Sequence, residues 1–234
     1  MKHPAPAPPP DAAEVFGSRL DLARRYADAL AGAGVEWGLI GPREVERIWE
    51  RHILNCAAVA DLIPPGARVI DIGSGAGLPG LPVAIARPDL KVTLVESMRR
   101  RTDFLKWVVD DLAAGDRVDV VRGRAEDPAV RTRLADADAV VSRAVADLEK
   151  LTRWSLPLLR SGGLMLALKG EQAEAEVAQA RTRMTALGAG AIEVVRCGHD
   201  STPPVTVVVA RKVQRALPGQ RARSAKRVPE RRRP

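Results

Sequence analysis

The stretch from Asp71 to Gly80, which reads DIGSGAGLPG, decides the fold of this 234-residue chain. A short run rich in Val and Ile, residues 67–73, leads into it, and a stretch of helical length, residues 78–86, follows it. A buried strand, a glycine-rich turn and a helix in this order form the setting in which nucleotides are bound. The stretch therefore predicts an α/β domain with a ligand site at the turn.

The spacing of the glycines narrows the kind of ligand. Gly73, Gly75 and Gly77 permit a sharp turn and let a ligand approach the backbone closely. The dinucleotide fingerprint requires glycine at relative positions one, three and six, but the sixth position here is Leu78. The spacing one, three and five, with Asp71 two residues earlier, is similar to the first motif of S-adenosyl-L-methionine-dependent methyltransferases. We expect that cofactor, with Asp71 orienting either the turn or the cofactor's ammonium group.

Two later segments extend the expected cofactor site. Glu96 stands at the end of the next predicted strand, where a carboxylate accepts hydrogen bonds from ribose hydroxyls in nucleotide-binding α/β folds. The loop of residues 123–127 follows the third predicted strand and is expected to flank the adenine ring; the alternative is an ordinary charged loop. Together with the turn, Glu96 favours a ligand that contains adenosine.

Short runs rich in Val, Ile and Leu alternate with stretches of helical length along the chain. The runs predict strands buried on both faces at residues 67–73, 91–96, 117–123, 138–142 and 163–169. Helices are expected at residues 78–86, 98–114, 148–159 and 171–187. The fold class is therefore α/β: a doubly wound, Rossmann-like methyltransferase sheet, mostly parallel. Residues 191–196 and 204–213 have no helix between them and predict an antiparallel edge.

Composition divides the chain into four segments. Residues 1–10 contain five prolines and little that could be buried, which predicts a disordered N-terminus. Residues 11–65 carry apolar residues at helical spacing and predict a helical N-terminal region. Residues 66–213 are expected to form the methyltransferase domain. Residues 214–234 are expected to be a disordered basic tail.

Nearly all the excess positive charge lies in that tail. The formal net charge is +8, and residues 215–234 contribute +7 of it through eight basic residues and Glu230. A flexible basic segment favours encounter with a polyanion such as RNA, although a solubilising extension is the alternative. The rest of the chain is almost neutral, so a basic surface there requires that the fold gathers basic side chains on one face.

Several protein classes are excluded by composition. Hydrophobic residues make up 46% of the chain and charged residues 28%, which is typical of a globular protein with a sizeable core. No apolar run is long enough for a membrane helix, so we expect a cytoplasmic protein that binds no membrane. Cys56 and Cys197 match no metal-ligand spacing and predict two buried thiols and no metal site. Aromatic residues are scarce, and the four tryptophans are expected to be core residues.

The motifs together resemble one family, the 16S ribosomal RNA guanine-N7 methyltransferases, also called the glucose-inhibited division protein B family. The resemblance covers about residues 40–170 and lies in RHIL (51–54), DIGSGAGLPG (71–80), Glu96, GRAE (123–126), SRA (142–144) and LALKG (166–170). It implies methyl transfer to N7 of a guanine in small-subunit rRNA near the decoding region. It also implies cofactor contacts from Gly73, Leu78, Ala125, Glu126 and Arg143.

Two segments depart from the family pattern. The family usually has Asn-Leu-Thr where this chain has Gly38, Leu39 and Ile40, and its histidine motif ends in Asp where this chain has Asn55. What the resemblance implies about RNA contacts therefore does not carry over to these residues. The methyltransferase core is not affected.

The candidate catalytic residues are few, as the chemistry permits. Guanine N7 carries a lone pair and no proton, so attack on a sulfonium methyl group needs no general base, and placement can supply most of the rate. Arg143 and Lys169 lie at the ends of predicted strands and are expected to hold the guanine or flanking phosphates. Arg124 and His52 are candidate helpers, although a histidine on a helix stripe is often simply packed.

Two other functions remain open at this point. The first is a methyltransferase for a small molecule or a protein, which RNA dependence of methyl incorporation would separate from the rRNA enzyme. The second is an RNA-binding module without catalytic activity, against which the intact Asp71, the glycines and Glu96 argue. The expected partner is 16S rRNA or the small ribosomal subunit, bound by a monomer.

Overall fold

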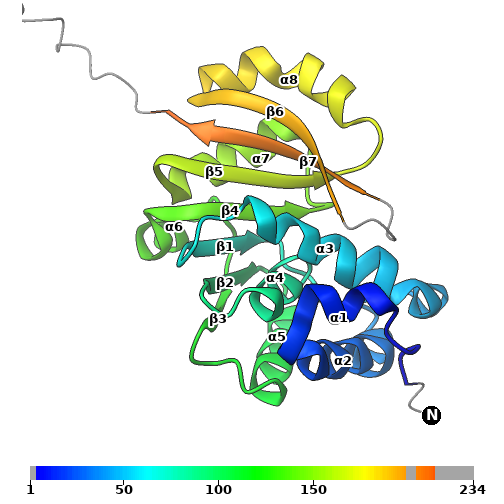
Figure 1. Ribbon diagram of the computed structural model, residues 1–234. Coiled ribbons are helices and arrows are strands. Elements are labelled where there is room, and N and C mark those ends of the chain that lie inside the picture. The colour runs from blue at the N-terminus through cyan, green and yellow to red at the C-terminus, as the bar shows by residue number, and fades with distance from the viewer. Residues whose placement is uncertain (1–3, 199–203, 214–234) are drawn as a thin grey trace, which may run out of the picture.

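The computed structural model describes residues 4–198 and 204–213. A seven-stranded sheet with the order β3-β2-β1-β4-β5-β7-β6 forms its middle layer (Figure 1). Strands β1 to β5 are parallel, whereas β7 runs antiparallel to both β5 and β6. This arrangement confirms the predicted fold class, including the antiparallel edge. The strands are β1 (Arg68–Ile72), β2 (Lys91–Glu96), β3 (Val118–Arg122), β4 (Ala137–Arg143), β5 (Leu159–Lys169), β6 (Ala189–Cys197) and β7 (Val205–Lys212).

Helices cover both faces of the sheet, because successive strand residues point to opposite sides. Val69 of β1 belongs to one apolar core and Ile70 to the other. The N-terminal helices, α4 (Gly80–Ala86) and α5 (Arg99–Asp111) enclose the first core. The second core lies under α6 (Pro128–Leu134), α7 (Leu148–Ser155) with its extension η6 (Leu156–Leu158), and α8 (Ala173–Ala186).

The N-terminal region is helical, as expected, and packs on the same face as α4 and α5 (Figure 1). It is built from short elements joined almost without a break, and its first core residues are Ala12 and Phe16. The elements are α1 (Pro10–Phe16), η1 (Gly17–Arg19), α2 (Leu20–Ala29), η2 (Leu30–Gly34), η3 (Pro42–Arg47), η4 (Ile48–Leu54), α3 (Asn55–Ala57) and η5 (Ala58–Leu62). The region thus shares a core with the sheet.

The proline-rich start differs from the disorder expected for residues 1–10. The backbone N–H of Ala5 donates to Asp28 Oδ1 at 3.0 Å, and the indole Nε1 of Trp49 donates to the Pro6 carbonyl at 2.7 Å. Pro10 already begins α1, since proline suits the first turn of a helix. A segment whose prolines are already restricted loses little backbone entropy on docking. Residues 1–3 and the basic tail, 214–234, lie outside the described residues.

Two elements differ from the sequence prediction. Helix α6 occupies a connection for which no helix was expected, although Asp127 before it and Pro128 at its first position are typical helix-start residues. Strand β5 begins at Leu159, four residues earlier than the predicted 163. Its first part pairs with the start of β4, where the register shifts between Ala137 and Ala139.

The tryptophans and cysteines vary in burial. Trp49 is buried, but Trp107 is 44% exposed, which corrects the expectation of a core residue. Cys56 is buried and Cys197 is only partly so, and both are free thiols. Within the described residues, no helix is long and apolar enough to cross a membrane.

Candidate active site

The carboxyl ends of the parallel strands bring most of the predicted site residues to one edge of the sheet. Glu96, Arg143 and Lys169 are the last residues of β2, β4 and β5. The glycine-rich turn follows β1, and the loop that contains Arg124 follows β3. In open α/β sheets ligands bind at this edge. The residues singled out from five separate segments therefore lie along one edge of the sheet.

The backbone of the turn explains its glycines. Gly73, Gly75 and Gly77 have φ angles of +71°, +58° and +100°, which residues with a Cβ rarely adopt. A Cβ on Gly73 would also lie 2.9 Å from a Val145 methyl group, and a Cβ on Gly77 would overlap Leu81. At Gly75 the nearest atom would be 3.9 Å away. Gly75 is thus the glycine whose open side leaves room for a ligand.

Asp71 orients the turn, which was one of its two expected roles. Its Oδ2 accepts the backbone N–H of Gly80 at 3.0 Å and so ties the start of α4 to the end of β1. The side chain is fully buried, and its Oδ1 has no hydrogen-bond partner among the described residues. Burial raises the pKa of Asp71 to about 7, with a smaller contribution from the Glu96 carboxylate. The unpartnered Oδ1 can accept a cationic donor.

Glu96 links β2 to the turn. Its Oε2 accepts the backbone N–H of Gly75 at 3.1 Å, and its Oε1 accepts that of Met98 at 2.9 Å. Arg101 Nη1 lies 3.6 Å from Oε2, and only 4% of the Glu96 residue is exposed. The carboxylate is therefore held in a fixed orientation at the mouth of the turn.

A pocket lies beside this carboxylate, and four predicted cofactor residues line it: Gly73, Glu96, Ala125 and Glu126. The candidate catalytic helper Arg124 lines it as well. Trp154 of α7 and Val145 line it too, and sequence reasoning missed both. Trp154 had been assigned to the core because it lies on a helical stripe. Asp71, Gly75, Gly77 and Leu78 form the turn beneath the pocket but do not line it.

Tyr26 of α2 is a further residue that sequence reasoning missed. It is fully buried, and its hydroxyl donates to the Ala76 carbonyl in the glycine-rich turn at 3.0 Å. Burial raises the pKa of Tyr26 well above its usual value, so the hydroxyl stays protonated and remains a donor. Tyr26 is the one tyrosine of the chain and lies in an alanine-rich predicted helix. This unusual position is the feature of the sequence that could have indicated a role at the turn.

Arg143 points toward the N-terminal region. Its Nη1 donates to the Arg51 carbonyl and to Cys56 Sγ, both at 3.1 Å, and its Nη2 lies 2.6 Å from Nδ1 of His52. His52 Nε2 in turn contacts Glu44 Oε2 at 2.9 Å. Burial raises the pKa of Cys56 to about 11, so its sulfur is a neutral thiol at physiological pH. Arg143 thus joins β4 to η4 and α3.

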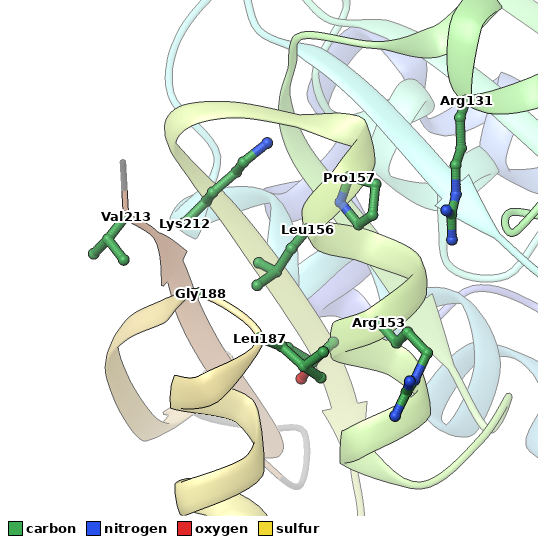
Figure 2. Close-up of a pocket in the computed structure, with 9 residues that line it drawn as sticks. Arg131, Arg153, Leu156, Pro157, Leu187, Gly188, Lys212 and Val213 are labelled. Carbon is green, nitrogen blue, oxygen red and sulfur yellow. The ribbon is translucent and has the colours of Figure 1, made fainter. Parts of the chain in front are cut away.

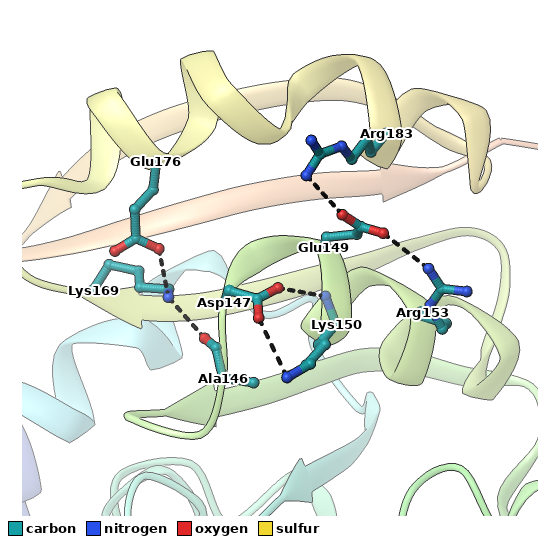
Figure 3. Close-up of polar contacts among 8 residues, drawn as sticks. All are labelled: Ala146, Asp147, Glu149, Lys150, Arg153, Lys169, Glu176 and Arg183. Carbon is teal, nitrogen blue, oxygen red and sulfur yellow. Dashed lines mark hydrogen bonds and ion pairs between the residues drawn. The ribbon is translucent and has the colours of Figure 1, made fainter.

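Lys169 is also engaged within the protein (Figure 3). Its Nζ donates to the Ala146 carbonyl at 2.9 Å and to Glu176 Oε2 of α8 at 2.7 Å. The side chain is 13% exposed. Its ammonium therefore fixes the segment after β4, next to Asp147, whose Oδ1 accepts the first-turn N–H of Lys150 in α7. Arg124, in contrast, is 69% exposed and lies 3.9 Å from Glu126.

A second pocket at the same edge adjoins the predicted cofactor pocket. It has a volume of about 390 Å³, within the range of small-molecule sites. Its walls are Arg51, Asn55, Arg143, Ala144, Leu168, Lys169, Gly170 and Val205. Ala144 lines this pocket and the next residue, Val145, lines the cofactor pocket, so one short segment separates the two. Ala144 has a φ of +52°, a strained value for alanine, and such strain clusters at functional sites.

A pocket near the amino end of β5 contains none of the predicted site residues (Figure 2). Leu156, Pro157 and Leu187 give it an apolar wall, and Arg131, Arg153 and Lys212 surround it. Lys212 Nζ donates to the Leu159 carbonyl at 2.5 Å, and Arg153 Nη2 pairs with Glu149 at 2.9 Å. The predicted site residues at the strand ends therefore lie at the opposite edge of the sheet from this pocket.

Sequence comparison finds relatives along most of the chain. The family model described as rRNA small subunit methyltransferase G matches residues 19–204. Mycolicibacterium smegmatis has a protein named Ribosomal RNA small subunit methyltransferase G that is 60% identical over 222 residues, covering 94% of this chain and 93% of the relative. The protein of the same name from Mycobacterium marinum is 60% identical over 211 residues, covering 90% of this chain and 92% of the relative.

Solved structures share the fold at low sequence identity. A predicted O-methyltransferase, protein Atu636 from Agrobacterium tumefaciens, has a TM-score of 0.55 and 22% identity, covering 69% of this chain and 82% of that chain. M. jannaschii TYW2 in complex with AdoMet has a TM-score of 0.54 and 18% identity, covering 70% of this chain and 77% of that chain. Both support the architecture described above.

Proposed function

Because this chain belongs to the rRNA small subunit methyltransferase G family, we propose that it transfers a methyl group from S-adenosyl-L-methionine to N7 of a guanine in 16S rRNA. One observation carries the proposal: the glycine-rich turn and the acid are hydrogen-bonded to each other. The backbone N–H of Gly75 donates to Glu96, and Glu96 lines a pocket. A glycine-rich turn without an oriented acid would be much weaker support for an adenosine-containing ligand.

The residues at the turn fit this cofactor. The buried Oδ1 of Asp71 has no partner, so it is suited to the ammonium of the methionyl group. Glu96 is suited to the ribose hydroxyls, and the Gly123–Asp127 loop with Ala125 and Glu126 to the adenine. Gly75 leaves space for its approach, and Gly73, Gly77 and Leu78 shape the turn that the cofactor would contact. When bound, the cofactor supplies an electrophilic methyl group.

The chain's own task is placement. Guanine N7 carries a lone pair in the ring plane and no proton, so no residue has to remove one. Arg143 and Lys169 hold the two strand ends around the second pocket through their bonds to His52 and Ala146. We assign both residues to positioning of the guanine site, His52 to holding Arg143, and the exposed Arg124 to contact with RNA phosphates.

Other features of the proposal follow from the substrate. The small ribosomal subunit is a cytoplasmic polyanion, so we place the protein in the cytoplasm as a monomer that binds no membrane. The tail of residues 214–234, outside the described residues, would add sequence-independent attraction to RNA through its charge of +7.

The proposal is tested by methyl incorporation from labelled S-adenosyl-L-methionine. Small ribosomal subunits from cells that lack this protein are offered as substrate, beside the same subunits digested with ribonuclease and a protein extract without RNA. We expect label only in the intact rRNA. Label in the protein extract would support the protein-methyltransferase alternative, and binding of the cofactor without any transfer would support an RNA-binding module without catalytic activity.

A further inference from the structure

The second pocket has polar walls, but two of the cationic side chains that line it, Arg143 and Lys169, already donate hydrogen bonds to other groups of the protein. The guanidinium of Arg143 donates to three groups of the N-terminal region, and the ammonium of Lys169 donates to Ala146 and Glu176. Arg51 lies 3.4 Å from Glu44 and is half exposed. These three cations are donors only, so a donor on an entering base needs a different partner in this pocket.

Asn55 is an acceptor in the wall of this pocket. It is the first residue of α3 and lines the pocket beside Arg51 and Arg143. Its Oδ1 is buried and has no hydrogen-bond partner among the described residues. An unpaired buried acceptor is costly, so such atoms are rare and call for a physical reason. A donor supplied by the substrate would remove this cost.

Guanine has suitable donors on the edge that does not react. Its N1–H and its exocyclic amino group lie on the Watson–Crick edge, on the far side of the base from the imidazole ring that carries N7. An acceptor at that edge leaves N7 free to face the cofactor pocket. Adenine has no N1–H, and its N1 would face Oδ1 as a second acceptor. An amide oxygen at this place therefore favours guanine.

We propose, on the basis of the proposed function, that Asn55 Oδ1 accepts a hydrogen bond from the Watson–Crick edge of the target guanine and so determines base specificity. Asn55 is a specificity-determining residue in this role. It takes no part in bond making, and its contribution arises in the complex with RNA. The free protein should therefore not depend on it for stability.

Two substitutions separate the acceptor from the rest of the side chain. Asn55→Leu has a similar volume and removes the acceptor, whereas Asn55→Asp keeps an acceptor for the N1–H and the amino group. The matched control is Gln179→Leu, which removes an amide from an exposed position on α8. We expect Asn55→Leu to lower kcat/KM for small ribosomal subunits about tenfold or more and Asn55→Asp to stay within about threefold, because one lost hydrogen bond has this order of effect. The control should match the unaltered protein, and Asn55→Leu should have the same cofactor Kd and an unchanged or higher Tm.

A second readout would not respond to a merely structural role. Once the modified position is mapped, rRNA with guanosine or adenosine at that position is bound in the presence of S-adenosylhomocysteine. The unaltered protein should prefer the guanosine form, and Asn55→Leu should bring the ratio of the two Kd values toward one. An unchanged ratio together with unchanged kcat/KM would overturn the role of Asn55 alone. Absence of rRNA methylation by the unaltered protein would overturn the proposed function, and the Asn55 inference with it.

Discussion

Nη2 of Arg143 lies 2.6 Å from Nδ1 of His52, and this contact fixes the state of the imidazole. A guanidinium only donates, so Nδ1 must accept and the ring proton must sit on Nε2, from which it is donated to Glu44. Both ring nitrogens are thus occupied. Burial, followed by the positive charge of Arg143, lowers the pKa of His52, so the ring is neutral at physiological pH. His52 in this arrangement positions Arg143 and has no free nitrogen to act as a base.

Arg143 should be replaceable by neither lysine nor alanine. Its fork reaches the Arg51 carbonyl, Cys56 and His52 together, and a lysine ammonium is a point charge that cannot satisfy all three. Arg143→Ala leaves the acceptors on buried His52 and Cys56 unpaired, so we expect a loss of about 1–3 kcal/mol in the free energy of unfolding. Arg143→Lys should recover less than half of it. Urea denaturation measures both, and full recovery by lysine would show that only charge matters at this position.

Glu96 and Gly75 should control cofactor affinity. Glu96→Ala removes an acceptor proposed for the ribose and the partner of the Gly75 N–H, and Gly75→Val forces a branched residue into a φ of +58° on the open side of the turn. We expect the Kd measured by titration calorimetry to rise about tenfold or more in each. Glu193→Ala, at an exposed position on β6, is the matched control. Equal affinities in Glu96→Ala and the control would refute the assignment of Glu96.

Cofactor binding should depend on pH through Asp71. Its pKa of about 7 means that the carboxyl is largely protonated below neutral pH, whereas a cofactor ammonium favours the ionised form. Affinity should therefore increase as the pH rises from about 5.5 to 7.5, and Asp71→Asn should abolish the increase. Parallel pH profiles for the two proteins would show that Asp71 does not contact the cofactor.

The Asp71 carboxyl should also make the stability of the free protein depend on pH, in the opposite direction to cofactor affinity. An unfolded Asp releases its proton near pH 3.9, whereas folded Asp71 retains it until about pH 7. The folded state binds the extra proton between these values, so the free energy of unfolding contributed by Asp71 falls as the pH rises through this window. The free energy of unfolding of the unaltered protein, measured relative to that of Asp71→Asn, should therefore decrease as the pH rises through this window. A difference that is constant with pH would contradict the raised pKa.

Deletion of residues 214–234 should alter RNA binding selectively. The deletion removes +7 of the net charge of +8, so rRNA affinity should drop most at low salt and the plot of log affinity against log salt should become shallower. Cofactor affinity should not change. Filter binding between about 50 and 200 mM salt measures the two slopes, and identical slopes would show that the tail does not contact RNA.

The sequence predicted the fold well because its signals are local. The DIGSGAGLPG turn and the alternation of buried strands with helices predict a parallel sheet. The right-handed crossover rule then predicts how its strands are connected. The misses have local reasons too. Helix α6 spans only Pro128–Leu134, too short for apolar periodicity to show, and the first part of β5 is interrupted by Gly162 and Gly163.

The site was predicted only in part, because side-chain partners depend on tertiary contacts. Strand ends placed Glu96, Arg143 and Lys169 at one edge, but no pattern indicated that Arg143 would bond to His52 or Lys169 to Glu176. Tyr26 lies 50 residues before the turn carbonyl that it binds. Asn55 was noted only as a departure from a family pattern, and its buried, unpaired oxygen became visible only in three dimensions.

The central claim is that this protein methylates guanine N7 by placement without a general base. It is tested most directly by the single-turnover rate of N7-methylguanine formation in small-subunit rRNA, at saturating cofactor and RNA, between about pH 6 and 8.5, a range that includes the ordinary pKa of histidine. The account predicts product at N7 and a nearly flat rate for the unaltered protein and for His52→Gln. A steep profile with an apparent pKa near the histidine value, lost in His52→Gln, would contradict it.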